Sequence, residues 1–574
     1  MKTQLFLILS ICLFPFLLKA QGECGSSIAQ QMLIRQMPAY QQQIALHNQQ
    51  WAEQQTDLRT AKKVISGKDT VYEVPVVFHI IHSGEPLGSL YNPADSVIDS
   101  VLVFLNKTFA ATWPSHPDVT AGGVRIPIRF VLAKRTPDCK PTNGITRTDG
   151  RFIKDYERYG VSIGAREDSL KSVTAWPNTL YYNIWIVRRI EGYGGFAYLY
   201  SSAGRRDGTM ADISSVTRIS AAWGYNYILP HELGHAFSLY HTFEGGCLDT
   251  NCLMNGDLIC DTEPHTVQGC VSGTNACTGK PYGNTVYNYM NYSNSCADRF
   301  TPMQKERMVY SVLGDRLSLL YSEGATPPDP SFVAPTAACI IPALPKTGRN
   351  IGPARVMLDS LYSSTGGFSQ DGDTGYLDRT CFYPPVHLQE GKSYALQVGS
   401  GIEYQYHRAW IDYNNDGTFS ASEEVMKTGA FYGNYTLQTD TFTVPRTGVV
   451  YNTPLRLRVS ADVTASFTAC SLMIGQAEDY SVIVHRDTTS AIPSVSAEND
   501  IRVFPNPVAD QLHILSPQPL DLFLYSLEGR LLMQTHAQTT LQVGSLPNGF
   551  YLLRMADAHT GATIRYHKLQ KWSN

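Results

Sequence analysis

The segment HELGHAFSLYH, residues 231–241, constrains this chain more than any other stretch. His231 and His235 are four residues apart, so on a helix they lie on one face and can bind one ion through imidazole nitrogens. Glu232 lies beside them, where its carboxylate can take a proton from a metal-bound water. His241 can be a third ligand only if the helix ends and the chain turns back, which leaves a fourth position on zinc open for catalysis. Three histidines at this spacing are far more specific than HExxH alone, and they predict a zinc site.

Two further residues decide how the backbone of this segment can fold. Ser238 stands where the common form of the pattern has glycine, at a turn that requires a left-handed conformation. Serine in that conformation costs about 1 kcal/mol, and three metal bonds together with nearby disulfides can offset this. We therefore expect a retained site with a strained or slightly altered turn. Pro230 disfavours a helical Leu229, so the helix is expected to begin near Asn226 or to kink there.

The first 20 residues have the pattern of a secretory signal peptide. Lys2 supplies the positive start, residues 5–18 form an apolar core too short to span a bilayer, and LKAQ offers cleavage after Ala20. No later stretch approaches about 18 uninterrupted apolar residues, so we expect a mature protein without a transmembrane segment. The net charge of −4 and the lack of a long basic run argue against nucleic acid as a partner.

The chain has 12 cysteines, and their positions indicate disulfides formed in an oxidising compartment. Cys12 lies in the signal peptide and Cys24 is isolated near the mature N-terminus, so Cys24 either has a separate role or stays free. Six of the remaining cysteines crowd together just after the histidine segment: Cys247, Cys252, Cys260, Cys270, Cys277 and Cys296. Because no paired CxxC spacing occurs among them, a disulfide-stapled loop is favoured over a second zinc site.

Hydrophobic patterning divides the mature chain into a helical pro-segment, an α/β domain and two β-rich domains. Residues 71–82 predict a first core strand, residues 94–113 a long helix, and residues 125–135 and 180–190 further strands. Beyond residue 338 only short alternating strands and turns occur, which is typical of β-sandwiches. The expected boundaries are signal peptide 1–20, pro-segment 21–70, catalytic domain 71–322, linker 323–338, β-sandwich 339–485, linker 486–500 and C-terminal β-sandwich 501–574.

The stretch DYNNDGTFSASE, residues 412–423, fits the spacing of a calcium-binding loop. The expected ligands are the side chains of Asp412, Asn414, Asp416 and Glu423 and the carbonyl of Thr418. The flanking residues predict strands rather than paired helices, so the loop would be isolated. A hairpin turn at NNDG explains the same residues, and both interpretations stay open.

The motifs as a set resemble the pappalysin family of metzincin metalloproteases. They are HELGHAFSLYHTFEGGC, then GDLICDTEP, then YNYMNYSNSCADRFTPMQKERM, preceded by VPVVFHIIH, and the resemblance covers roughly residues 70–322. It implies a catalytic domain with a twisted mixed sheet, an active-site helix and a Met-turn. His231, His235 and His241 match the zinc ligands, and Glu232 matches the general base.

The resemblance also implies roles for residues outside the histidine segment. Met290 matches the Met-turn methionine, a hydrophobic base under the metal that binds nothing. Tyr292 matches a tyrosine that steadies the tetrahedral intermediate or is displaced by substrate. Asp257 and Thr262, with the carbonyl of Cys260, match a structural calcium loop, although a solvated acidic loop explains these residues too.

The sequence ECGSS around Cys24 resembles the Cys-Gly element of pappalysin pro-segments. The resemblance implies that the Cys24 thiolate fills the open zinc position and keeps the precursor latent. A disulfide partner or a free thiol is the alternative. Activation would then require cleavage between about 50 and 70, near Arg59 or Lys62–Lys63.

Two details of the family pattern stay less defined. Among the disulfides, Cys252–Cys277 and Cys270–Cys296 match the family best, although six cysteines permit 15 pairings. Family members that cleave before Arg or Lys use an acidic residue just after the Met-turn. This chain has Asn294 and Ser295 there, with Asp298 beyond, so a preference for basic residues is in doubt.

Two further resemblances concern the β-rich domains. GQAEDYSV, residues 475–482, together with the loop 412–423, resembles GEVED-type β-sandwich domains. IRVFPNPVADQLHI, LYSLEGRLL, LPNGFYLLRM and HKLQK, within residues 501–574, resemble the C-terminal sorting domain of the type IX secretion system. This implies the type IX machinery as a partner, and a product that is secreted or attached to the outer cell surface.

Two functions of different classes follow. The first is a secreted zinc endopeptidase that acts on proteins or peptides, is made as a latent precursor, and uses catalytic Zn²⁺ and structural Ca²⁺. The second is a surface adhesin on a metzincin scaffold that has lost activity through Ser238. The intact Glu232 and the three histidines favour the enzyme.

Overall fold

The computed structural model describes most of the chain, and its contacts divide into two compact units, residues 1–52 with 72–485 and residues 53–71 with 486–574. The expected signal peptide, Lys62–Lys63, Asn294, Ser295 and nearly all of the second linker lie outside the described residues. These described residues are 24–60, 71–113, 123–217, 219–220, 224–225, 227–248, 250–267, 269–293, 296–320, 322–339, 341, 351–365, 375–400, 404–429, 431–432, 437–486, 501–516, 518–526, 531–558 and 563–571.

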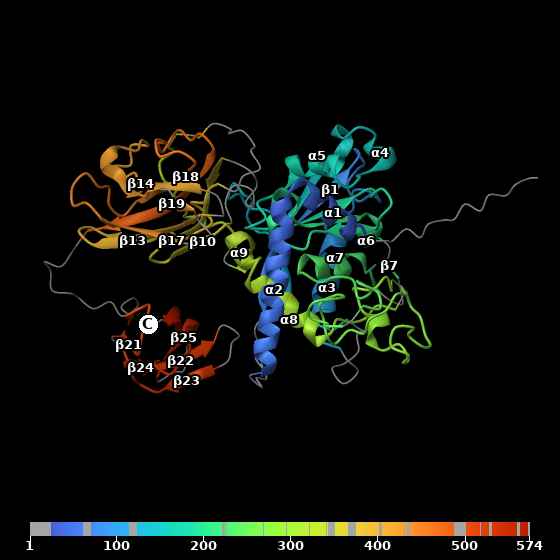
Figure 1. Ribbon diagram of the computed structural model, residues 1–574. Coiled ribbons are helices and arrows are strands. Elements are labelled where there is room, and N and C mark those ends of the chain that lie inside the picture. Colours follow the sequence, from blue (N-terminus) through green and yellow to red (C-terminus); the bar gives the residue numbers. More distant parts are fainter. Residues whose placement is uncertain are drawn as a thin grey trace, which may run out of the picture. The chain divides into compact units, whose positions relative to one another are not determined.

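A mixed sheet of six strands forms the centre of the region that carries the histidine segment (Figure 1). Its order is β2-β1-β4-β6-β5, and β3 pairs with the second half of β1. All pairings are parallel except that of β5 with β6. The strands are β1 Tyr72–His82, β2 Ile128–Leu132, β3 Ile145–Asp149, β4 Tyr182–Val187, β5 Gly195–Ala197 and β6 Thr209–Asp212.

Helices cover this sheet, and the longest helix after residue 70 has a clear apolar face. In α3, Asp95–Phe109, the side chains of Ile98, Val101, Leu105 and Phe109 are buried at helical spacing. They pack into one core with the apolar residues of β1, β2 and β4. The other elements of this region are α4 Tyr156–Tyr159, α5 Ala165–Thr174, α6 Ser214–Thr217, β7 Ile219–Ser220, β8 Gly224–Tyr225, α7 Ile228–Ala236, α8 Pro302–Leu313 and α9 Leu317–Leu320.

The expected pro-segment forms two helices against this region, α1 Ser26–Gln36 and α2 Pro38–Thr60. α1 lies beside β5, where Cys24 forms a parallel bridge with Gly195 and Gly25 N donates to Gly195 O at 2.8 Å. The pro-segment therefore adds to the open edge of the sheet, next to α7.

The region after residue 350 is built almost entirely of strands. One sheet has the order β10-β9-β13-β17, the other β11-β19-β18-β14-β15, with β12 beside β19 and β16 beside β14. Apolar residues of both sheets share one core, including Val356, Val398, Leu457 and Val482. The strands are β9 Pro353–Leu358, β10 Leu361–Ser364, β11 Tyr376–Asp378, β12 Val386–Gln389, β13 Ser393–Ser400, β14 Tyr404–Ile411, β15 Glu424–Lys427, β16 Phe431–Tyr432, β17 Leu437–Thr443, β18 Pro454–Asp462 and β19 Gly475–His485.

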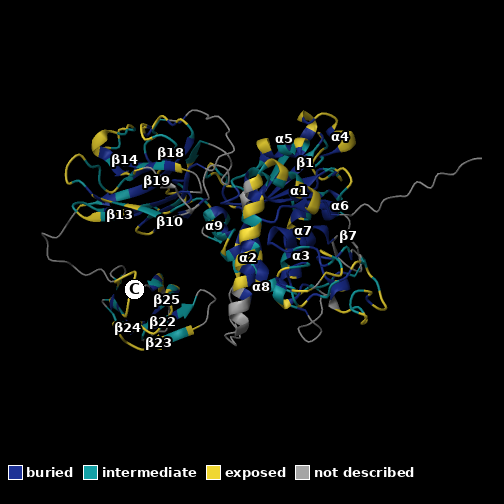
Figure 2. Ribbon diagram, in the orientation of Figure 1, coloured by how far each residue is buried: buried dark blue, intermediate teal, exposed yellow. Residues whose placement is uncertain are grey.

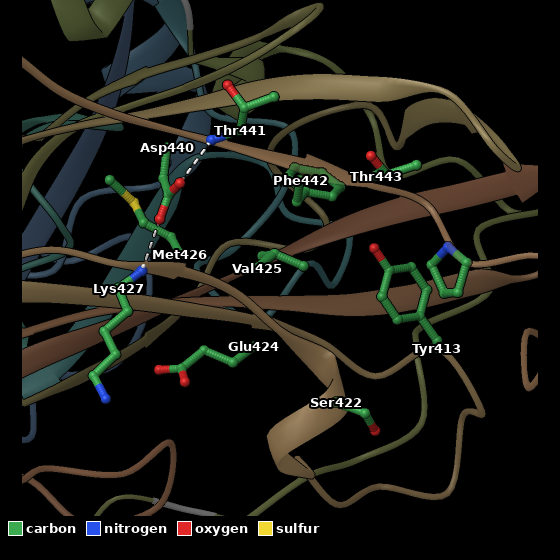
Figure 3. A pocket seen from close by; sticks show the side chains of 11 residues that line it. Tyr413, Ser422, Glu424, Val425, Met426, Lys427, Asp440, Thr441, Phe442 and Thr443 are labelled. Carbon is green, nitrogen blue, oxygen red and sulfur yellow. Dashed lines mark hydrogen bonds between the residues drawn. The ribbon is translucent and has the colours of Figure 1, made fainter.

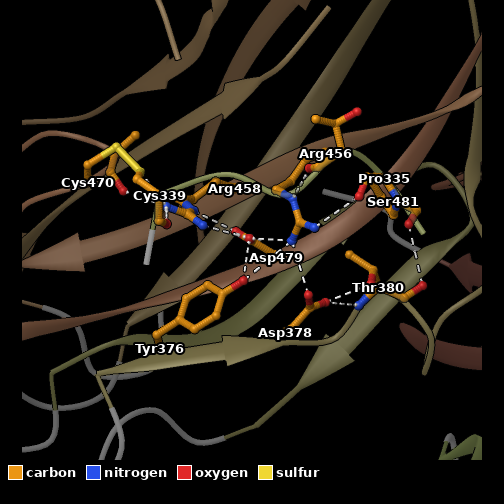
Figure 4. Close-up of polar contacts among 12 residues, drawn as sticks. Pro335, Cys339, Tyr376, Asp378, Thr380, Arg456, Arg458, Cys470, Asp479 and Ser481 are labelled. Carbon is orange, nitrogen blue, oxygen red and sulfur yellow. Dashed lines mark hydrogen bonds and ion pairs between the residues drawn. A yellow bond between two sulfur atoms is a disulfide. The ribbon is translucent and has the colours of Figure 1, made fainter. Parts of the chain in front are cut away.

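A buried ion-pair network holds the end of the preceding linker against these strands (Figure 4). Arg458 forms two 2.7 Å hydrogen bonds to the Asp479 carboxylate, and Arg456 a third at 2.7 Å. The same two guanidinium groups donate to the backbone carbonyls of Thr336 at 3.0 Å and Cys339 at 2.9 Å. Because buried charges are stable only when paired and hydrogen-bonded, this network fixes the linker end locally.

The second unit contains a further set of strands, described by itself. Its sheets have the orders β20-β21-β24 and β23-β22-β25-β26, and their apolar residues share one core. The strands are β20 Arg502–Phe504, β21 Gln511–Leu515, β22 Leu520–Ser526, β23 Leu531–Thr535, β24 Thr540–Gln542, β25 Gly549–Asp557 and β26 Thr563–Lys571.

Five disulfides join cysteines of the described residues, and they correct one expectation. Cys270–Cys296 is formed as the resemblance implies, but the expected Cys252–Cys277 pair is wrong. A tight turn, in which the amides of Met254 and Asn255 both donate to Asn251 O, brings Cys252 to Cys260 instead. The five bonds are Cys139–Cys381, Cys247–Cys277, Cys252–Cys260, Cys270–Cys296 and Cys339–Cys470.

Candidate metal centre

The histidine segment begins on α7, Ile228–Ala236, whose nine residues are all buried (Figure 2). The helix starts two residues later than expected and does not need a kink at Pro230. Pro230 is the third helical residue, where its missing N–H would have no intrahelical partner. The first helical N–H bond is donated by His231 to Tyr227 O at 3.0 Å. The first ligand therefore lies on a regular helix.

The turn to His241 is made by Ser238 in the left-handed conformation, with φ +73°. The Ser238 hydroxyl donates to Ser311 Oγ at 2.9 Å, and the Ser238 carbonyl accepts from Arg307 Nε at 2.7 Å. Two residues before Ser238, the carbonyl of Ala236 accepts a hydrogen bond from Arg316 Nε at 2.7 Å. Side chains from α8 and the segment after it thus supply hydrogen bonds to a turn that lacks glycine.

The three histidines present their Nε2 atoms to one point. His235 Nε2 lies 3.2 Å from His231 Nε2 and 3.1 Å from His241 Nε2. On the far side of the rings, His231 Nδ1 contacts Tyr289 O at 2.6 Å and His235 Nδ1 contacts Leu239 O at 2.7 Å. A carbonyl accepts only from N–H, so both rings are fixed in the tautomer that leaves Nε2 free to bind a metal.

Cys24 of the expected pro-segment joins this group. Among the described residues, one cluster of His, Cys, Asp or Glu has ligand atoms that all lie within 4.8 Å of one another: Cys24, His231, His235 and His241. Cys24 is also the one free cysteine of the described part, and it is buried. Three imidazole nitrogens and a thiol are a donor set that zinc prefers, so the residues present fit the metal.

Glu232 lies between the metal cluster and the pro-segment. Its Oε2 accepts from Ser26 Oγ at 3.0 Å and from Cys24 Sγ at 3.4 Å. Ser26 Oγ in turn accepts the backbone N–H of Ala197, in β5, at 2.9 Å. The carboxylate therefore points toward the cluster and is covered by the pro-segment.

Burial dominates the electrostatics of this centre. It raises the pKa of Glu232 to about 8, against the opposing effect of hydrogen bonds from Ser26 and Cys24. Burial, followed by the charge of Glu232, raises the pKa of the Cys24 thiol well above its usual value. It lowers the pKa of His231 to about 4 and holds those of His235 and His241 well below the usual value. Neutral imidazoles, the form that binds metal, are therefore favoured.

Met290 and Tyr292, the two expected Met-turn residues, both lie close to the histidine segment. Met290 is fully buried beneath α7, and a Cβ added at Gly234 would come within 2.2 Å of its sulfur. Gly234 is thus the residue that lets methionine pack there. The Tyr292 ring lies 5.0 Å from the His241 ring, and its hydroxyl donates to Cys24 O at 3.4 Å. Tyr292 faces the cluster.

The expected first calcium loop brings several oxygens together. Thr262 Oγ1 lies 3.0 and 2.8 Å from the two carboxylate oxygens of Asp257 and 2.9 Å from Ile259 O. A hydroxyl has one proton and can satisfy only one of these three acceptors. Burial raises the pKa of Asp257 to about 7. The carbonyl that belongs to this group is that of Ile259, the residue before Cys260.

The expected second calcium loop is arranged differently. Both carboxylate oxygens of Glu423 accept backbone N–H groups, of Tyr413 at 2.9 Å and Ser420 at 2.8 Å. The Asp412 carboxylate accepts from the backbone N–H groups of Asp416 and Gly417 at 3.1 and 2.9 Å. Among the described residues, the one group of His, Cys, Asp or Glu that could hold a metal does not include these acids. The remaining expected ligands also form hydrogen bonds within the loop: Asn414 Nδ2 donates to Asp416 Oδ2, and Thr418 N donates to Asp416 Oδ1.

A cavity of about 380 Å³ lies in the same β-rich region, between β15 and β17 (Figure 3). Its lining includes Tyr413, Lys427 and Phe442 but no residue of the metal cluster. The backbone N–H of Lys427 in β15 donates to the Asp440 carboxylate at 3.2 Å. The Asp440 side chain thus satisfies a backbone N–H at the edge of the sheet. The cavity is separate from the candidate metal centre.

Sequence reasoning missed some residues that shape the centre. Ser26 carried no signal beyond its place in ECGSS, two residues after Cys24. Phe243 stacks on the His241 ring at 4.7 Å with an interplanar angle of 9°. Arg307 is distant in sequence, and no local pattern links it to Ser238. Only the folded chain brings these residues together.

Comparisons with known proteins find relatives that are extracellular metalloproteases. An extracellular metalloprotease of Neurospora crassa is 42% identical over 258 residues, which cover 43% of this chain and 77% of that protein. One of Colletotrichum graminicola is 28% identical over 246 residues, 41% of this chain and 74% of that protein. The solved structure of mature Tannerella forsythia mirolysin in complex with a cleaved peptide is 24% identical in sequence. The match covers 44% of this chain and 97% of that one, with a TM-score of 0.37.

The fold and the site, with these relatives, define a metalloprotease. A sequence profile described as Pregnancy-associated plasma protein-A matches residues 165–313. The chain belongs to this family, the pappalysins, whose metal is zinc.

The two later regions match known domains as well. A GEVED domain matches residues 406–483, and a secretion system C-terminal sorting domain matches residues 502–567. With extracellular relatives, this sorting domain indicates a protein that is secreted or attached to the cell surface through type IX secretion. No helix among the described residues is long and apolar enough to cross a membrane.

Proposed function

We propose that this protein is a secreted, metzincin-type zinc endopeptidase that hydrolyses proteins or peptides and is made as a latent precursor. The observation that carries the proposal is the convergence of three imidazole Nε2 atoms beside a buried glutamate. We assign the metal to His231, His235 and His241, with Cys24 as a fourth ligand in the precursor. Bound there, zinc would polarise the scissile carbonyl and make water more acidic.

Glu232 is the proposed general base. It follows the first ligand on α7, and its carboxylate lies next to the metal cluster, where it can take a proton from the attacking water and deliver it to the leaving amine. Tyr292 is placed to donate its hydroxyl to the developing oxyanion once the pro-segment is gone.

Latency is the proposed role of the pro-segment. The Cys24 thiol belongs to the metal cluster, and the Ser26 hydroxyl donates a hydrogen bond to the Glu232 carboxylate. While residues 24–26 stay in place, neither water nor substrate can bind at the fourth metal position or next to this carboxylate. Cleavage between about 50 and 70 would break the covalent link between this segment and the enzyme. We further propose protein or peptide substrates, the type IX machinery as a partner, and β-sandwich domains over 339–485 and 501–574.

We retain structural calcium as a proposal for the Asp257 loop, supported by the four oxygens that meet there. The loop 412–423 has a weaker basis, because its acids are already satisfied by backbone N–H groups.

Metal removal tests the function. Mature protein freed from its pro-segment should cleave casein or gelatin, lose this activity in chelator, and recover it with about one equivalent of zinc. Activity that persists after complete zinc removal, with zinc content measured by mass spectrometry, would refute the assignment.

A further inference from the structure

One face of α2 carries a row of buried or half-buried side chains that face the metalloprotease domain. Tyr40, Ile44, His47, Asn48 and Trp51 follow one another at helical spacing. Tyr40 and Trp51 are each 1% exposed and His47 is 6% exposed. Successive large anchors on one helix face are typical of a helix that binds in a groove. This set of five residues is called the anchor face below.

The side-chain amide of Asn48 makes three hydrogen bonds to the metalloprotease domain. Its Oδ1 accepts from Arg307 Nη2 at 2.6 Å and from the Tyr200 hydroxyl at 3.2 Å, and its Nδ2 donates to the Tyr240 hydroxyl at 3.1 Å. One half-buried amide therefore contacts three polar groups that come from distant parts of the domain. An amide with matched partners gives specificity as well as binding free energy.

The aromatic anchors occupy the rest of the surface. His47 packs edge-on against Tyr200 and Tyr310, with ring centroids 4.6 and 4.9 Å apart, and its Nδ1 lies 2.8 Å from Asp315 Oδ2. Trp51 donates from Nε1 to the Leu258 carbonyl at 3.2 Å. We call the surface formed by Tyr200, Tyr240, Leu258, Arg307, Tyr310 and Asp315 the helix seat.

The helix seat uses no residue of the metal cluster. Cys24 and Ser26 reach the cluster and Glu232, whereas the anchor face binds at positions 40–51 of the same segment. None of these contacts involves a residue beyond position 52, so a cut between 61 and 70 leaves every one of them intact. Cleavage alone would not remove the segment.

We propose that the helix seat is a helix-binding site of the metalloprotease domain, and that residues 24–60 stay bound there after the chain is cut between 61 and 70. The proposal rests on the proposed function only for the place of cleavage. The cut segment then acts as a tightly bound inhibitor in trans, and activity appears only when α2 leaves its seat or is degraded.

Arg307 links the helix seat to the turn of the metal centre. Its Nη2 donates to Asn48 and its Nε to the Ser238 carbonyl, three residues before His241. When α2 leaves, the Arg307 guanidinium loses one hydrogen-bond acceptor. It also loses contact with the Trp51 ring, whose centroid lies 5.6 Å from Arg307 Cζ. The side chain that supports the turn therefore contacts the bound segment directly.

The test uses the full-length precursor carrying Glu232→Ala, in which residues 62–68 are replaced by the recognition sequence of a site-specific protease. Because this protein needs no activity of its own, its result is independent of the proposed function. After cutting, size-exclusion chromatography and mass spectrometry show whether residues 24–60 co-elute with the remainder. We expect co-elution from the parent, and at least about tenfold weaker retention from Trp51→Ala or Asn48→Ala.

Two controls separate the helix seat from other causes. Gln42→Ala changes an exposed residue of the same helix and should retain the segment like the parent. Cys24→Ala should also retain it, because the anchor face and not the thiol supplies the binding. The melting temperature of each uncut variant should equal that of the uncut parent, because the intact chain holds α2 in place before cleavage. Release from the parent as fast as from Trp51→Ala, or release by Cys24→Ala alone, would overturn the proposal.

Discussion

The hydroxyl of Ser26 donates a hydrogen bond to Oε2 of Glu232 across 3.0 Å. Its oxygen also accepts the N–H of Ala197 on the edge strand β5 at 2.9 Å. The pro-segment thus engages the candidate base and the sheet edge as well as the metal cluster. The proposed latency therefore involves two side chains, those of Cys24 and Ser26.

The first prediction concerns these two residues. Cys24→Ala should speed autoactivation of the purified precursor, because a metal ligand is lost. Ser26→Ala should speed it less, because it removes one hydrogen bond worth about 1 kcal/mol and leaves the thiol. Gel-based time courses of processing measure both, with the exposed neighbour Ser27→Ala as control. Unchanged latency in Cys24→Ala would contradict the assignment.

The second prediction concerns Ser238. Ser238→Gly relieves left-handed strain of about 1 kcal/mol but loses the hydrogen bond to Ser311, so the free energy of unfolding should change by less than about 1 kcal/mol. Ser238→Val should destabilise by more than about 2 kcal/mol, because a β-branched residue is disfavoured at φ +73°. Urea unfolding of the Glu232→Ala precursor measures both. A large loss in Ser238→Gly would show that the hydroxyl, and not the backbone, dominates this turn.

The third prediction concerns pH. Burial lowers the pKa of His79 in β1 to about 4, against the opposing effect of its hydrogen bond to Asn183. Its two ring nitrogens lie 2.7 Å from Thr146 Oγ1 and 2.9 Å from Asn183 Oδ1. The unfolded chain therefore binds more protons between about pH 6.5 and 4. Stability from neutral His79 is complete above this window and is lost as pH falls through it, by up to about 2 kcal/mol at pH 5. Replacement by Phe should shrink the difference in unfolding free energy between pH 7.5 and 5; an unchanged difference would contradict this.

The fourth prediction concerns calcium. If a cation binds between Asp257 and Thr262, added calcium should raise the melting temperature of the precursor and chelation should lower it. Asp257→Asn should abolish this response, because it removes the only charged ligand of the group. Asp416→Asn, in the loop 412–423, is the matched control and should leave the response intact. A calcium response that persists in Asp257→Asn would place the site elsewhere.

Strong local patterns made parts of the fold predictable. The apolar run of 71–82 became β1 Tyr72–His82, and the helical spacing in 94–113 became α3 Asp95–Phe109. In both, burial follows directly from side-chain periodicity. The histidine segment also folds as expected, since its spacing alone specifies a helix followed by a turn.

Other features depend on tertiary contacts and left no such pattern. β5 has three residues and exists because it pairs with β6, yet it is the strand against which Cys24 lies. The partner of Cys252 is decided by a local turn, which spacing could not reveal. Arg307 supports Ser238 from 69 residues away in the sequence. Short strands, disulfide choice and long-range support are set by the assembled core rather than by neighbouring residues.

The central claim is that His231, His235 and His241 hold zinc while Glu232 acts as the base. Its most direct measurement compares mature wild-type protein with Glu232→Ala for casein cleavage and for bound zinc. We expect the Glu232→Ala protein to keep about one equivalent of zinc and to lose at least about 99% of the activity. Equal cleavage by both proteins at equal zinc content would contradict it.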